Sequence, residues 1–138
     1  PIYGSNDEGA DGMMANIAAV SLGAAAGACL RWVLGLLLAD TVTVFALGTL
    51  AANWLGGFAI GVFAGLDGNW PGITPQMRLL VVTDFLGGLT TFSGFSLEIV
   101  AMMQQQRYAD VLMTVSLHLF GSLALTALGI WCVHAWRG

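Results

Sequence analysis

The chain has 138 residues, of which 57% are hydrophobic and 9% are charged, with four arginines, no lysine and a net charge of −4. So little charge cannot solvate a soluble domain of this size, and the hydrophobic fraction excludes a disordered chain. A nucleic-acid partner is excluded because no basic surface can be built, and a mean hydropathy of +0.81 indicates a membrane protein.

The first twelve residues, PIYGSNDEGADG, are polar and acidic and lack the basic region of a secretory signal. We interpret residues 1–12 as a tail outside the fold, disordered or left from processing or expression, because Met13 and Met14 offer a natural start. Residues 13–138 then form a single four-helix transmembrane domain.

Long uncharged stretches divide this domain. Runs of 19, 26 and 26 residues separate charged residues, and a helix needs about 20 mostly apolar residues to cross a bilayer. A fourth apolar stretch lies around residues 77–103. The sequence therefore predicts an all-α membrane protein with four transmembrane helices, at about residues 15–39, 43–66, 77–102 and 111–136.

Glycine is frequent, at 19 of 138 residues, and it is spaced by four in the first two spans. The first span contains Gly23 and Gly27, and the second contains Gly57, Gly61 and Gly65. Small residues at this spacing let helices approach closely in lipid. The pattern predicts tight helix packing but does not indicate a particular function.

The third span contains GGLTTFSGFS at residues 87–96, which is a poor continuous helix. We expect this helix to be broken near its middle. Serine and threonine hydroxyls that bond their own backbone would make it a kinked helix. Alternatively, the freed carbonyls can bind a cation while hydroxyls and aromatic edges face an anion. The residues alone leave both readings open.

The fourth span has a polar stripe, because four polar residues step by four along it and so share one helix face. These residues are Thr114, His118, Ser122 and Thr126. Such a stripe often forms hydrogen bonds between helices, and it can also line a pore.

The arginines do not fix an orientation in the membrane. Arg78 and Arg137 fall on one side, while Arg107 and Arg31, near the end of the first span, fall on the other. With two arginines on each side, the chain can insert in both orientations, which allows an antiparallel, dual-topology homodimer. Alternatively, neighbouring proteins or lipids could fix one orientation. Arg31 either attracts anions to a vestibule or pairs with Asp40 or a helix carbonyl.

Three segments resemble one family. The run DFLGGLTTFSGFSLE, residues 84–98, resembles the signature GG-x-TTFSTF of the Fluc (CrcB) fluoride channels. GACLRW at 27–32 is similar to its first-span G-x-x-LR motif, and GTLAANWLGGFAIG at 48–61 is similar to its second span, including Asn53. The resemblance covers residues 15–136. It implies a passive fluoride channel in the cytoplasmic membrane of a prokaryote, built as an antiparallel homodimer with two pores at the interface.

The resemblance also implies which residues form each pore: Asn53, Phe92, Ser93, Phe95, Glu98, His118 and Ser122. Fluoride is strongly hydrated, so a pore must replace its water with donors such as the Asn53 amide and the hydroxyls. Phenylalanine rings have a positive edge that can face an anion, which is the role implied for Phe92 and Phe95. Ser93, His118 and Ser122 would extend a polar track, and Glu98 would lie near a pore mouth.

A structural sodium ion is implied at the dimer centre, held by backbone carbonyls of Gly87 and Thr90 from both chains. Carbonyl oxygens without side-chain charge suit an alkali cation and not a transition metal. Two residues depart from the family pattern. Gly94 replaces a frequent threonine, and Asp84 replaces a frequent glycine.

Two other membrane functions do not fit the sequence. A small dual-topology multidrug/proton antiporter needs an acidic residue in the middle of its first span, and this chain has none there. A heme-anchoring subunit needs two facing histidines, but His118 and His134 are 16 residues apart on one helix. No nucleophile–base set, phosphate loop or metal cluster is recognisable, so the chain is not expected to be an enzyme.

Overall fold

The structure is a computed structural model that describes residues 9–38, 47–67, 72 and 74–137. All regular structure in these residues is helical, and four helices are long and apolar enough to cross a membrane. They span Ala10–Leu38, Leu47–Leu66, Leu80–Gln104 and Tyr108–Arg137. The prediction of an all-α, multi-pass membrane protein with four transmembrane helices is confirmed.

The third span is assembled from several helical pieces, whereas the other three spans are single helices. The elements are α1 (Ala10–Leu38), α2 (Leu47–Asp67), α3 (Pro75–Arg78), the π-helix η1 (Leu79–Leu86), α4 (Gly87–Leu89), α5 (Phe92–Gln104) and α6 (Tyr108–Arg137). Helix α1 begins inside the predicted tail, of which residues 1–8 lie outside the described residues. The first predicted loop and much of the second also lie outside them.

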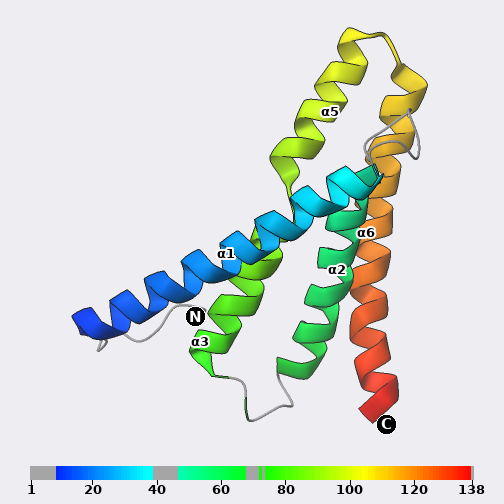
Figure 1. Cartoon of the computed structure of the whole chain (residues 1–138). Coiled ribbons are helices and arrows are strands. Elements are labelled where there is room, and N and C mark those ends of the chain that lie inside the picture. The colour runs from blue at the N-terminus through cyan, green and yellow to red at the C-terminus, as the bar shows by residue number, and fades with distance from the viewer. Residues whose placement is uncertain (1–8, 39–46, 68–71, 73, 138) are drawn as a thin grey trace.

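Helices α2 and α6 lie side by side, and α1 crosses the third span at its η1–α4 part (Figure 1). The α2–α6 contact depends on small residues, as predicted. A Cβ added at Gly61 would fall on the Thr126 carbonyl, and one at Gly129 would fall on the Phe58 carbonyl. The Thr126 hydroxyl donates a hydrogen bond of 2.8 Å to the Gly57 carbonyl. The two backbones are therefore as close as glycine allows.

We expect Gly61→Ala to destabilise the protein by about 1–3 kcal/mol, the usual cost of overpacking. The added methyl group meets the Thr126 backbone, which cannot rotate away as a flexible side chain would. Chemical unfolding in detergent measures the change. Gly35→Ala is the matched control, because a Cβ at Gly35 meets no described atom within 4 Å. Equal stability of the two variants would contradict this account of α2–α6 packing.

The contact between α1 and the third span contains two features that the sequence did not predict. Residues 79–86 form a π-helix, and Asp84 within it is buried, with 2% of its surface exposed. Its Cβ lies 2.7 Å from where a Cβ at Gly23 would be. Within the described residues, Asp84 Oδ2 has no hydrogen-bond partner. The carboxyl group that departs from the family pattern therefore packs against α1.

Candidate functional site

The third span breaks at Thr90 and Thr91, whose backbones are extended, with ψ angles of 153° and 117°. The prediction of a helix broken near its middle is confirmed. The Gly87–Gly88 pair, however, stays helical. Gly88 has a packing role instead, because a Cβ there would lie 2.7 Å from the Ala24 carbonyl oxygen of α1. The break is thus displaced from the glycines to the two threonines.

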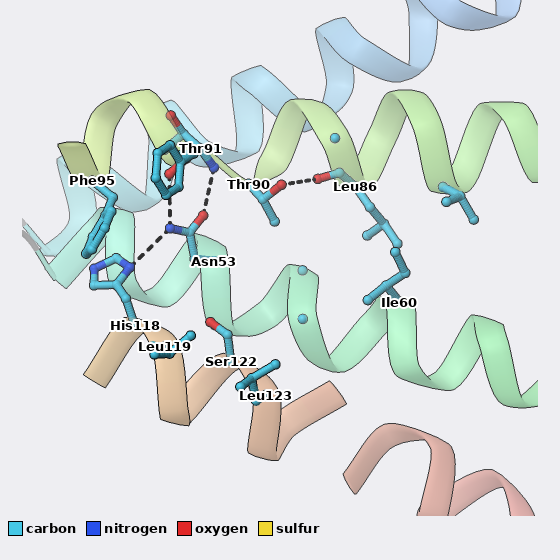
Figure 2. A pocket seen from close by; sticks show the side chains of 15 residues that line it. Asn53, Ile60, Leu86, Thr90, Thr91, Phe95, His118, Leu119, Ser122 and Leu123 are labelled. Atoms are coloured by element: carbon cyan, nitrogen blue, oxygen red, sulfur yellow. Dashed lines mark hydrogen bonds between the residues drawn. The ribbon is translucent and has the colours of Figure 1, made fainter. Parts of the chain in front are cut away.

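Asn53 of α2 holds the break by pairing with both backbone groups of Thr91 (Figure 2). The Thr91 N–H donates to Asn53 Oδ1 at 2.7 Å, and Asn53 Nδ2 donates to the Thr91 carbonyl at 3.1 Å. A broken helix at bilayer depth needs such internal partners, because lipid offers none. The resemblance implied that the Asn53 amide serves an ion, whereas here the amide binds the backbone of a neighbouring span.

The break leaves the four carbonyls of residues 87–90 without their helical donors, among them those of Gly87 and Thr90. In a continuous helix, the Thr91 N–H would bond the Gly87 carbonyl, but it donates to Asn53 instead. The Gly94 N–H would bond the Thr90 carbonyl, but it donates to the Thr91 hydroxyl at 3.0 Å. Thr91 thus acts as N-cap of α5. This central role was not predicted, although a threonine directly before a helix is a known capping signal.

Arg31 lies beside the break. Its Nε donates to the Gly88 carbonyl at 3.2 Å, which is the carbonyl pairing that was one of the alternatives considered for it. Asp40 lies outside the described residues. Arg31 therefore lies at the depth of the broken segment and not at a span end.

Aromatic side chains continue from the break into α5. Phe92 and Phe95 are tilted against each other with ring centroids 5.7 Å apart, and Phe95 lies 4.6 Å from the His118 ring of α6. His118 is 7% exposed, and its Nδ1 is 3.2 Å from Asn53 Nδ2. Helices α2, α5 and α6 therefore meet in one cluster of polar and aromatic groups (Figure 2).

A cavity of about 470 Å³ adjoins this cluster and contains most of the predicted site residues in its wall. These are Asn53, Gly87, Thr90, Phe92, Phe95, His118 and Ser122. The rest of the wall is largely apolar, with side chains such as Ile60, Leu119 and Leu123. The cavity thus combines a few polar groups with an apolar surface, as ligand sites commonly do.

Three predicted site residues do not line this cavity. The Ser93 hydroxyl lies at the start of α5 and is 3.2 Å from the Thr91 hydroxyl. Glu98 lies further along α5, where it hydrogen-bonds the Thr49 side chain of α2. Its Oε2 is buried without a partner in the described part of the chain. Arg31, the third of these residues, lies on the α1 side of the break.

The sequence was compared with known proteins. The model of the family "CrcB-like protein, Camphor Resistance (CrcB)" matches residues 18–130. The chain is 48% identical over 124 residues to a protein of Burkholderia vietnamiensis, covering 90% of this chain and 97% of that protein. It is 51% identical over 118 residues to one of Albidiferax ferrireducens, covering 86% and 90%. A protein of Polynucleobacter asymbioticus is 47% identical over 123 residues, covering 89% and 98%.

Each of these relatives is named "Fluoride-specific ion channel FluC". They are channels and not enzymes, in agreement with the sequence-based expectation for this chain. The family match extends over more than three quarters of the chain and includes the second span, the broken third span and most of the first and fourth. This chain therefore belongs to the CrcB-like family.

Proposed function

We propose that the chain is a fluoride-selective passive channel that exports fluoride across the cytoplasmic membrane of a prokaryote. The observation that carries the proposal is the identity of about half of all residues, over nearly the whole chain, to proteins named as fluoride-specific channels. Hydrogen fluoride enters cells uncharged and dissociates inside. A membrane potential that is negative inside then drives the anion out, so no energy coupling is needed.

The cavity has the chemistry that such a pore needs. Moving an ion out of water is very costly unless polar groups replace its hydration shell. His118 and Ser122 of α6 lie in the wall of the cavity, and Phe92 and Phe95 can turn positive ring edges toward an anion. Ser93 and Glu98 continue the polar path along α5. Glu98 marks a pore mouth in this proposal, and Arg31 belongs to the vestibule.

Two copies of the chain complete the pores in an antiparallel, dual-topology homodimer. Phe92 lines the cavity and is nevertheless 79% exposed, so one chain leaves the wall open beside it. A second copy related by a two-fold axis in the membrane plane would close both cavities at once. The few polar groups in the open wall, such as the Asn53 amide, would then be covered by protein and not by lipid, and this supports the dimer.

A structural sodium ion at the dimer centre fits the residues present. The carbonyls of Gly87 and Thr90 are among those that lose their helical donors at the break, so each can serve as a hard oxygen ligand. When bound, the ion would compensate these carbonyls and join the two broken spans. We expect a crystal structure of the dimer to show, on the two-fold axis, roughly tetrahedral contacts clearly shorter than hydrogen bonds. Longer contacts typical of a water molecule would contradict it.

The direct test of the function is fluoride efflux from liposomes that contain the purified protein, with chloride as the control anion. We expect rapid fluoride efflux and little chloride efflux. Equal chloride flux, or no fluoride flux, would exclude the proposal. The alternative of a multidrug/proton antiporter is not supported by the comparisons, and α1 has no acidic residue beyond Asp11 in its first turn.

A further inference from the structure

The hydrogen bonds around Asn53 determine the protonation state of His118. The Thr91 N–H can only donate, so the Asn53 atom that lies 2.7 Å away must be the oxygen. The amide nitrogen then faces the Thr91 carbonyl at 3.1 Å and His118 Nδ1 at 3.2 Å. Since an amide nitrogen only donates, its two hydrogens are directed to these two acceptors, and His118 Nδ1 must be an acceptor.

Every other arrangement of the Asn53 amide and the His118 ring places two hydrogen-bond donors against each other. Turning the Asn53 amide over would place its NH₂ against the Thr91 N–H. A charged imidazolium, or the neutral form with its hydrogen on Nδ1, would place an N–H against Asn53 Nδ2. Only the neutral imidazole with its hydrogen on Nε2 satisfies all three contacts.

His118 Nε2 has no partner for that hydrogen. The atom is buried, and it is without a hydrogen bond within the described residues. It lies on the side of the ring away from Asn53, next to Phe95 (Figure 2). A buried donor without an acceptor is unfavourable, so an acceptor from outside the chain that reaches this atom would be bound favourably.

We infer that Asn53 is a positioning residue that acts through His118. Its amide fixes the imidazole as the Nε2–H form, which makes Nε2–H the donor that a small anion meets beside Phe95. Both groups are suited to an anion, because Nε2–H is a donor and the edge of the Phe95 ring is also positive. On this account Asn53 does not touch the anion. The identification of that anion as fluoride rests on the proposed function, whereas the imidazole form does not.

Nitrogen NMR of the full-length protein in liposomes, labelled with ¹⁵N-histidine, tests the inference directly. The chain has only two histidines, so the spectrum of His134→Asn contains only the His118 signals. The exposed His134, observed in His118→Asn, serves as the comparison. We expect the Nε2–H form of His118 to exceed the Nδ1–H form by about tenfold or more, the ratio that a bias of about 1.4 kcal/mol produces. We expect a mixture of forms for His134. The same ratio of the Nε2–H and Nδ1–H forms at both histidines would overturn the inference.

Asn53→Asp is the variant that separates positioning from mere packing. A carboxylate at this position can still accept from the Thr91 N–H, but it cannot donate to His118 Nδ1. We therefore expect Nδ1 to gain a hydrogen in this variant, as the neutral Nδ1–H form or as the imidazolium. An imidazole that keeps the wild-type form in this variant would show that Asn53 does not control it. Should the variant fail to fold, the wild-type ratio above decides by itself.

Sodium fluoride and sodium chloride, added separately to the His134→Asn protein, test the donor role. We expect fluoride to move the Nε2 resonance and to leave Nδ1 nearly unchanged, while chloride moves neither. An unmoved Nε2 in saturating fluoride would overturn the donor assignment. Efflux measurements keep the two proposals apart. Fluoride flux with an Nδ1–H imidazole would refute this inference alone, and an Nε2–H imidazole without fluoride flux would refute the proposed function alone.

Discussion

Phe95→Ile is expected to lower fluoride flux by about tenfold or more while the dimer still assembles. Isoleucine keeps most of the apolar bulk but has no ring, so the positive edge beside His118 is lost. A loss of about 1.4 kcal/mol on the barrier is enough for a tenfold effect. Phe92→Ile should act in the same direction, because Phe92 also lines the cavity. Flux into fluoride-free buffer, measured with a fluoride electrode, gives the rates.

Phe120→Ile is the matched control for these two variants. Phe120 is on α6, is 65% exposed and is not among the residues that line the cavity. Its replacement should leave the flux near the wild-type value. Wild-type flux in the Phe92 and Phe95 variants would mean that both rings are packing residues.

Asn53→Ala is expected to have the largest effect on stability. It removes both hydrogen bonds to the Thr91 backbone and the contact with His118. The Thr91 N–H is left without a partner, at about 1–3 kcal/mol, and the two other lost hydrogen bonds contribute about 0.5–1.5 kcal/mol each, which amounts to about 2–6 kcal/mol. Unfolding in detergent, followed by denaturant titration, measures the change.

Ser122→Ala is a suitable control for this stability measurement. Ser122 lies in the wall of the same cavity but takes no part in the hydrogen bonds that hold the break. We expect its unfolding midpoint to move much less than that of Asn53→Ala. A similar shift in both variants would indicate that the cavity wall in general, and not the Asn53–Thr91 pairing, determines stability.

The spans and their close packing could be predicted because each depends on local sequence. Uncharged stretches of sufficient length give the four helices, and glycines spaced by four give the α2–α6 contact at Gly57 and Gly61. The break was predicted from composition, since glycine and threonine weaken a helix. The position of the break was not predicted, because packing against Ala24 keeps Gly88 helical and Asn53 holds Thr91 extended.

Pairings between spans could not be predicted from the residues alone. Arg31 and Gly88 are 57 positions apart, and Asn53 and His118 are 65 apart. Such contacts depend on how the helices dock, which hydropathy and residue spacing do not specify. The burial of Asp84 likewise depends on α1, which comes close to it at Gly23. The resemblance to a family supplied the names of the site residues but not the hydrogen bonds among them.

The pairing of Asn53 with Thr91 has a consequence for the way in which the protein is made. The partner that replaces the helical hydrogen bonds of Thr91 lies 38 residues away, in a different span. Until α2 has docked, an opened third segment would expose unpaired backbone groups to lipid, at a cost of several kcal/mol each. A third segment that enters the bilayer as a continuous helix, and opens when it meets the second span, would avoid this cost. In this order of events, four continuous helices insert first, and the break in the third forms when the helices pack together.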